Sequence, residues 1–171
     1  MLGHLPETIE PFRLANQGET LKGQLALGRM QRLMGMVEGV EGDINVTLAF
    51  SVDDNRMRYV DEHISTALKL VCQRCMDEMV FSIDLKMQVG FVLSDEQAKH
   101  LPEEYDPLVV EDDTVVLADL VEDEIILALP LVAMHETDEC NKGSSDMKNT
   151  SESEIEMEPR ENPFAILKSL K

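Results

Sequence analysis

The sequence lacks several features that would indicate a particular class of protein. It contains no tryptophan and only five phenylalanines and two tyrosines, so aliphatic and methionine side chains must supply most of the core. No segment approaches the roughly 18 consecutive apolar residues of a membrane span. Residues 1–7 have neither the positive nor the apolar region of a secretory signal. We therefore expect a cytoplasmic protein with no membrane association.

Cysteine and positive charge are also scarce. Three cysteines cannot all pair within one monomer, so reduced thiols are expected. Residues 1–90 hold 9 basic and 13 acidic side chains, whereas residues 91–171 hold 6 and 21, and the net charge is −19. Nucleic-acid affinity comes largely from Lys and Arg that replace counterions. This balance excludes DNA as a partner, allows only weak or indirect RNA contact and favours a basic protein partner.

Alternating apolar and polar residues predict an α+β fold with a mainly antiparallel sheet. Long strands are expected at 42–53, 56–71 and 79–93. The last is long for a strand, so we expect a bend or bulge at Gly90. Shorter elements are expected on either side of these strands: a strand at 19–27, helices at 30–37 and from Ser94, and edge strands at 108–110 and 115–117.

Residues 118–129 are the clearest helix, with acidic residues in the first half and Pro130 at the end. Its second half, from Ile125 to Leu129, is apolar all round and is therefore expected to be buried against the sheet. The run Glu122-Asp123-Glu124 is predicted to be a solvated face, because consecutive helix positions point in different directions.

The chain divides into one α+β domain and an appendage. The sequence predicts that residues 1–140 form the domain and that 141–161 are an acidic flexible linker. Residues 162–171 are predicted to form a short amphipathic helix. Its apolar face holds Phe164, Leu167 and Leu170. So short a helix is marginal alone and needs a surface, which belongs either to its own domain or to a partner.

One constellation could support metal chemistry. Cys72-Gln73-Arg74-Cys75 falls at the expected reversal between two long strands, and His135 and Cys140 follow the buried helix. A set of three cysteines and one histidine is a standard structural zinc site. Inert reduced cysteines, a vestigial metal site and a redox pair remain alternatives. A redox pair usually needs a helix N-terminus to lower its thiol pKa.

Nothing in the sequence indicates an enzyme. There is no phosphate loop, nucleophile elbow or paired Ser and His signature, and no base accompanies the cysteines. We therefore predict no catalytic residues. A metal-dependent RNA-processing enzyme centred on the cysteines and a zinc-stabilised protein-interaction module are the alternatives.

Five segments together resemble the bacterial YceD family. They are Cys72–Cys75, Ser94–Ala98, Leu101–Pro107, Val121–Pro130 and Asn162–Leu170. The resemblance implies a non-catalytic role in the synthesis, processing or stability of large-subunit (23S) ribosomal RNA during ribosome biogenesis.

The resemblance and the charge together predict how the protein acts. An acidic chain is expected to reach ribosomal RNA through a basic ribosomal protein or assembly factor. Phe164, Leu167 and Leu170 are predicted to anchor that partner. The acidic contacts are expected from Glu111, Asp112, Asp113, Glu122 and Asp123. The basic positions that could touch RNA are Arg29, Arg32, Arg56, Arg58 and Arg74.

Overall fold

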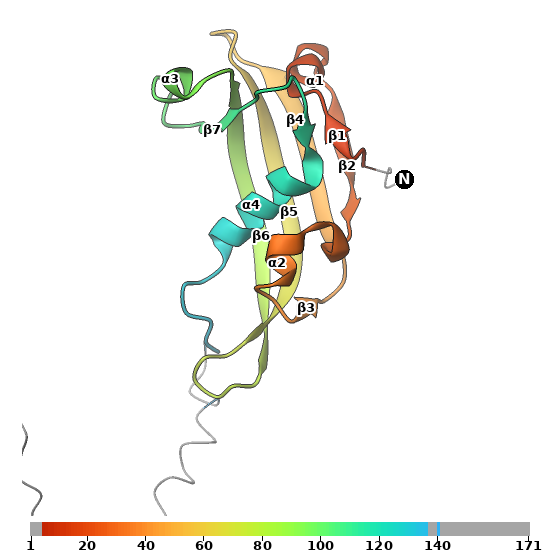
Figure 1. Cartoon of the computed structure of the whole chain (residues 1–171), viewed down its shortest axis with the longest axis vertical. Coiled ribbons are helices and arrows are strands. Elements are labelled where there is room, and N and C mark those ends of the chain that lie inside the picture. The colour runs from red at the N-terminus through yellow and green to blue at the C-terminus, as the bar shows by residue number, and fades with distance from the viewer. Residues whose placement is uncertain (1–4, 137–139, 141–171) are drawn as a thin grey trace, which may run out of the picture.

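A long, curved sheet runs the length of the molecule (Figure 1). The computed structural model describes residues 5–136 and Cys140. In chain order its elements are β1 (Thr8–Ile9), α1 (Pro11–Gln17), β2 (Thr20–Leu25), η1 (Leu27–Arg29), α2 (Gln31–Met34), β3 (Gly39–Val40), β4 (Ile44–Val52), β5 (Arg58–Val71), β6 (Glu78–Val92), α3 (Asp95–Ala98), β7 (Asp106–Val109), β8 (Val115–Val116) and α4 (Leu117–Ala128). The expected linker at 141–161 and helix at 162–171 lie outside the described residues.

The strands of the main sheet follow the order β2-β4-β5-β6-β7, and β3 pairs with the far end of β5. All these pairs are antiparallel except β6 and β7, which are parallel. β1 and β8 form a separate antiparallel pair. The predicted α+β class with a mainly antiparallel sheet is confirmed. The predicted edge strand at 108–110 begins earlier, at Asp106, and is parallel to β6 because the chain first returns through α3.

The sequence predicts a bend or bulge at Gly90, and the strand pairing shows no bulge there: β6 pairs with β7 in unbroken register from Val89↔Asp106 to Val92↔Val109. The pairing of β5 with β6 continues without a break from Tyr59↔Gly90 to Val71↔Glu78. Gly90 serves close packing instead, because an added Cβ would lie 2.9 Å from Leu101 Cδ2 and 3.1 Å from Tyr105 Cβ. The absence of a side chain therefore lets the segment after α3 lie directly on the strand.

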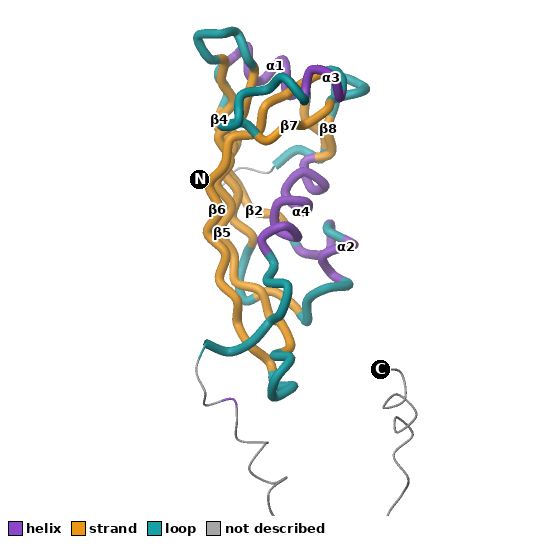
Figure 2. The backbone as a smooth tube through the Cα atoms, turned by 90° about the vertical axis from the view of Figure 1, so that its left-hand side faces the viewer, coloured by secondary structure: helices purple, strands orange, loops and turns teal. Residues whose placement is uncertain are grey.

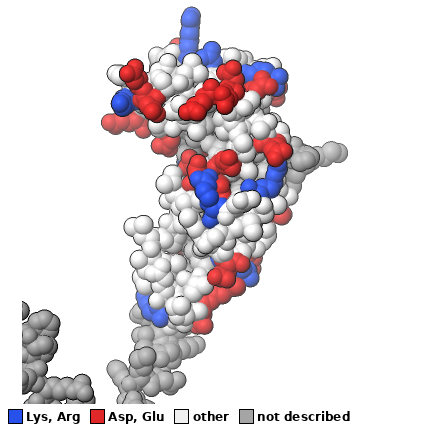
Figure 3. Space-filling view, viewed as in Figure 1, with Lys and Arg blue, Asp and Glu red and all other residues white. Residues whose placement is uncertain are grey.

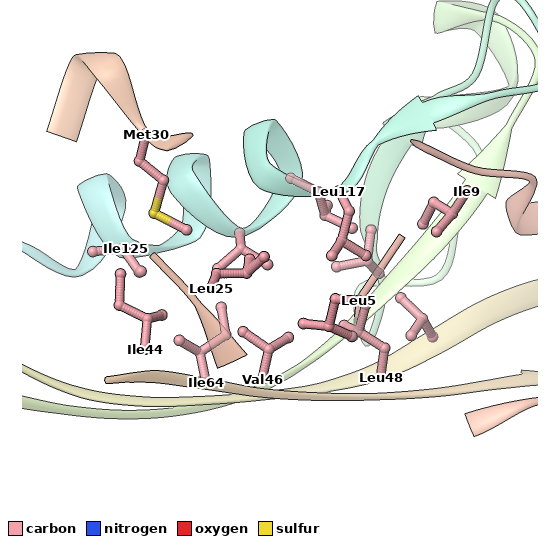
Figure 4. Close-up of a cluster of buried hydrophobic side chains, with 14 of the residues drawn as sticks. Leu5, Ile9, Leu25, Met30, Ile44, Val46, Leu48, Ile64, Leu117 and Ile125 are labelled. Carbon is pink, nitrogen blue, oxygen red and sulfur yellow. The ribbon is translucent and has the colours of Figure 1, made fainter. Parts of the chain in front are cut away.

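Helices cover one face of the sheet and leave the other bare in the described part of the chain (Figure 2). α4 crosses the covered face, where Leu117, Val121 and Ile125 are fully buried. Figure 4 shows Leu117 and Ile125 facing a row of apolar side chains from the strands. The inward positions of β4 (Ile44, Val46, Leu48, Phe50) and of β5 (Val60, Ile64, Leu68) are all buried. The apolar residues that alternate along the predicted strands therefore form the strand side of the core.

Two helix predictions need correction. The helix expected at 30–37 is only Gln31–Met34, which ends at Gly35. Helix α4 matches its prediction within one residue at each end, but its second half is not buried all round. Leu127 is 79% exposed, because α4 lies on the sheet as a single outer layer and its far side meets solvent.

Glu62 is a polar residue inside this core. It lies on the inward row of β5 between Val60 and Ile64, with an exposed fraction of 2%. Neither of its carboxylate oxygens has a hydrogen-bond partner among the described residues. Burial, reinforced by the negative charge of Glu124, raises the pKa of the Glu62 carboxyl to about 8. The folded protein therefore holds Glu62 protonated at neutral pH.

This burial predicts an unusual dependence of stability on pH. The unfolded chain releases the Glu62 proton above its ordinary pKa of 4.5, whereas the folded chain keeps it up to a pKa of about 8. The contribution to stability is therefore complete below pH 4.5 and is lost as the pH rises through 8. Between pH 5 and pH 7.5, the unfolding free energy of the wild type should fall by about 3 kcal/mol more than that of Glu62→Gln. Urea unfolding of both proteins at the two pH values measures this difference, and parallel pH profiles would refute it.

Candidate metal centre

The Cys72–Cys75 knuckle forms the reversal between β5 and β6, as the sequence predicts. The amide of Met76 donates to the Cys72 carbonyl at 2.8 Å, and the amide of Cys72 donates to the Asp77 carbonyl at 2.9 Å. Met76 takes a left-handed conformation with φ of 64°. This tight turn places both thiols on the same side of the hairpin end.

The segment after α4 brings the other two predicted ligands to this turn. The amide of Gln73 donates to the Ala133 carbonyl at 2.8 Å, which fixes the backbone of the segment against the knuckle. His135 Nδ1 then lies 3.5 Å from Cys75 Sγ. One ligand atom from each of Cys72, Cys75, His135 and Cys140 lies within 4.8 Å of all the others. The structure therefore assembles all four residues that the sequence singles out.

Backbone amides lower the pKa of the Cys72 thiol. Burial of Cys72 favours the neutral thiol, but the amides of Cys75, His135 and Arg74 outweigh it and lower the pKa to about 6. The Asp77 amide favours the Cys75 thiolate, but burial and the neighbouring Cys72 sulfur raise the Cys75 pKa to about 11. Two adjacent sulfurs cannot easily both be ionised without a cation between them. Here the amides of a β-turn, rather than those of a helix N-terminus, lower the pKa of the Cys72 thiol.

The donor set fits a zinc ion. Three sulfurs and one imidazole nitrogen are the ligands of a Cys₃His site, and amides directed at a ligating sulfur are typical outer-shell contacts. A redox pair needs only the two knuckle cysteines, so it does not explain why His135 and Cys140 converge on them. The four residues could hold one metal ion that ties the β5–β6 hairpin to the segment after α4.

Glu122 does not belong to an exposed acidic surface, contrary to the sequence prediction. Its side chain is buried, and Oε1 accepts hydrogen bonds from the backbone amides of Arg32 and Leu33 at 2.7 and 2.9 Å. Its Oε2 contacts the Arg32 guanidinium at 2.9 Å. α2 has no capping side chain of its own, so Glu122 caps that helix from α4. Burial favours the neutral acid, but these donors outweigh it and lower the Glu122 pKa.

The other predicted acidic contacts remain at the surface. Glu111, Asp112 and Asp113 are exposed in the segment between β7 and β8. Asp123 is also exposed, but its carboxylate pairs with Arg32 at 2.6 Å. The predicted apolar anchor, formed by Phe164, Leu167 and Leu170, lies outside the described residues.

Residues 95–119 form what we name the acidic end. Its exposed acids are Asp95, Glu96, Glu103, Glu104, Asp106, Glu111, Asp112, Asp113 and Asp119, and Lys99 is the one Lys or Arg in this range. Figure 3 shows acidic side chains gathered at the end of the molecule that carries α3 and β7. This end lies opposite the cysteine knuckle (Figure 1). The metal centre and the acidic end are thus separate sites.

Three of the basic residues that could touch RNA already make contacts within the chain. Arg32 pairs with Glu122 and Asp123. Arg58 donates to Asn16 Oδ1 at 2.9 Å and lies over the Phe12 ring. Arg74 lies 3.9 Å from the Met134 sulfur. In the described part of the chain, no helix is both long and apolar enough to cross a bilayer.

Comparison with known proteins identifies the family. The sequence profile described as Large ribosomal RNA subunit accumulation protein YceD matches residues 60–171. The chain belongs to the YceD family. A curated YceD protein of Haemophilus influenzae, also described as Large ribosomal RNA subunit accumulation protein YceD, is 33% identical over 168 residues, which cover 98% of this chain and 96% of the relative. The YceD resemblance of the five segments is thereby confirmed. No solved structure matches this chain.

Proposed function

We propose that this YceD chain is a non-catalytic cytoplasmic factor that supports large-subunit ribosomal RNA accumulation by binding a basic protein. The family name describes accumulation of an RNA and specifies no reaction. The partner class is a ribosomal protein or an assembly factor that itself contacts RNA. The YceD chain then acts on the RNA indirectly, by holding that partner.

The acidic end is the observation that supports this proposal most directly. Nine exposed acids and a single lysine lie within residues 95–119. Such a surface repels phosphate backbones and attracts basic proteins, with association that weakens as salt increases. Because Glu122 is buried and Asp123 pairs with Arg32, we assign the contact mainly to Glu111, Asp112 and Asp113 and to the acids around α3.

The metal centre has a structural role in this proposal. Four protein ligands complete a tetrahedral zinc site and leave no coordination position for a substrate or a reactive water. A zinc ion there would stabilise the end of the β5–β6 hairpin. The chain would accordingly be a zinc-stabilised interaction module, and RNA cleavage centred on the cysteines is the rival that this ligand set disfavours.

Capture from cell extract tests the partner proposal. Glu111→Gln, Asp112→Asn and Asp113→Asn together should reduce recovery of basic ribosomal proteins by at least about tenfold, because three charges are removed from the contact. A matched control, Asp43→Asn with Asp61→Asn and Asp84→Asn, changes the charge equally on the bare face of the sheet. Quantitative mass spectrometry of the captured proteins compares the two variants. Equal losses in both, or no loss in either, would count against a contact at the acidic end.

A further inference from the structure

An apolar groove of about 560 Å³ opens beside the metal centre. One wall comes from the end of α4 and the segment after it, including Ile126, Leu129 and Leu131, and Met36 and Met76 line the groove as well. The volume falls within the range of roughly 300–1,000 Å³ of pockets that take apolar ligands. This groove is distinct from the acidic end and from the four metal ligands.

The side chains around this groove are unusually exposed for apolar residues. Leu131 is 100% exposed, Met76 74% and Met36 55%. Between the charged side chains at the lower right and lower left of Figure 3, the surface of this face is mostly uncharged. A contiguous apolar surface of this kind on a soluble protein indicates that another segment binds there. Methionines make such a surface adaptable.

We propose that residues 162–171 of the same chain bind in this groove as an amphipathic helix. Phe164, Leu167 and Leu170 share one face of that predicted helix and supply apolar side chains to the groove. A segment of ten residues is marginal as a free helix, and burial of its apolar face stabilises it. Docking would therefore cover the exposed apolar side chains of the groove and bury the apolar face of the helix.

The length and starting point of the connecting chain make this contact accessible. His135 and Cys140 lie at the knuckle, next to Gln73 and Ala133, which line the groove. Twenty-one residues, 141–161, separate Cys140 from Asn162. A flexible chain of that length has a root-mean-square span of about 25 Å, so the segment stays near the groove at an effective concentration on the order of 1 mM.

The charges of the two surfaces also match. The segment carries Lys168 and Lys171 and no acidic side chain. Glu38 lines the groove, and Glu41 is exposed in the turn directly after β3. The two lysines at the C-terminal end of the helix can therefore lie near negative charge. A strongly acidic partner segment would be repelled from the same place.

Hydrogen exchange on the full chain tests this proposal. We expect the amides of residues 164–170 to exchange at least about tenfold more slowly than in Phe164→Asp, because the docked helix protects them. Leu131→Asp in the groove should remove this protection. Leu131 is fully exposed, so this change leaves the fold intact, as circular dichroism can verify. The matched control is Leu93→Asp, which alters another exposed leucine outside the groove and should leave the protection unchanged.

A photo-crosslinking residue at position 131 identifies the occupant. In the purified chain at low concentration, a crosslink from position 131 to 162–171 within one molecule supports the proposal. A crosslink between two chains would assign the groove to a second copy, and a crosslink formed only to another protein in cells would assign it to a partner. Either result, or unprotected amides at 164–170, would overturn intramolecular docking. None of these outcomes depends on binding at the acidic end.

Discussion

One zinc ion per chain should raise the melting temperature by about 10 °C, and His135→Gln should remove at least about two thirds of that rise. Zinc at a thousandfold excess over its dissociation constant stabilises the folded chain by about 4 kcal/mol if it binds only the folded state. For a protein of this size, that corresponds to a shift of roughly 10 °C. Removal of one of four ligands should weaken zinc binding by more than about 100-fold, since loss of even an outer-shell contact costs 10–100-fold.

The matched control for this experiment is His100→Gln. His100 is an exposed residue after α3, far from the knuckle along the sheet. Differential scanning calorimetry with and without a chelator gives the shift, and elemental analysis gives the metal content. If chelation leaves the wild-type melting temperature unchanged, or if both histidine variants behave alike, the four residues do not form a metal centre.

Glu122→Ala should lower the free energy of unfolding by about 3 kcal/mol. The change leaves the amides of Arg32 and Leu33 without their acceptor, and Leu33 is fully buried. An unsatisfied buried donor costs about 1–3 kcal/mol, and loss of one member of a buried ion pair costs about 3–5 kcal/mol. We expect a cost near the lower end of the ion-pair range, because Arg32 is half exposed and water can solvate its guanidinium.

Asp123→Ala provides the comparison for Glu122→Ala. Asp123 also pairs with Arg32, but both side chains are exposed in that pair, so its loss should cost less than about 1 kcal/mol. Denaturant unfolding at pH 7 measures both variants. A cost for Asp123→Ala equal to that for Glu122→Ala would show that the guanidinium pair, rather than the capping of α2, accounts for the stability.

Strand positions could be predicted from sequence because the alternation of apolar residues reports directly on burial. In β4, for example, Ile44, Val46 and Leu48 face the core as predicted. The pattern of apolar residues in a helix is a weaker guide to which face of the helix packs against the sheet. Leu127 therefore belongs to an apolar run and yet faces solvent. The parallel pairing of β7 likewise depends on the path of the chain through α3, which no periodicity reveals.

The convergence of the four candidate metal ligands could be predicted because metal ligands are rare residue types with restricted spacing. Residue type alone identifies four candidate ligands: Cys72, Cys75, His135 and Cys140. The role of Glu122 could not be predicted, since its partners are backbone amides of α2, about 90 residues away in the chain. The burial of Glu62 could have been predicted, because the two-residue alternation of β5 that places Ile64 inward also places Glu62 inward. Reading the strand residue by residue would have identified this buried acid.

The two candidate sites lie at opposite ends of one sheet. The hairpin end carries the candidate metal centre and the apolar groove, and residues of the segment that follows α4 contribute to both. The opposite end carries the acidic residues between α3 and α4, away from residues 129–136 (Figure 1). A partner bound at the acidic end would therefore leave the metal centre undisturbed. The central claim is that this partner is a basic protein rather than RNA.

Carbodiimide crosslinking with mass spectrometry, applied to the chain in growing cells, tests that claim most directly. Carbodiimide joins a carboxylate to a lysine without a spacer, so it reports which lysines touch which acids. We predict crosslinks from the acids of residues 95–119, Glu111, Asp112 and Asp113 among them, to lysines of a ribosomal protein or assembly factor. Absence of such crosslinks, together with ultraviolet crosslinks from the same residues to ribosomal RNA, would contradict the account.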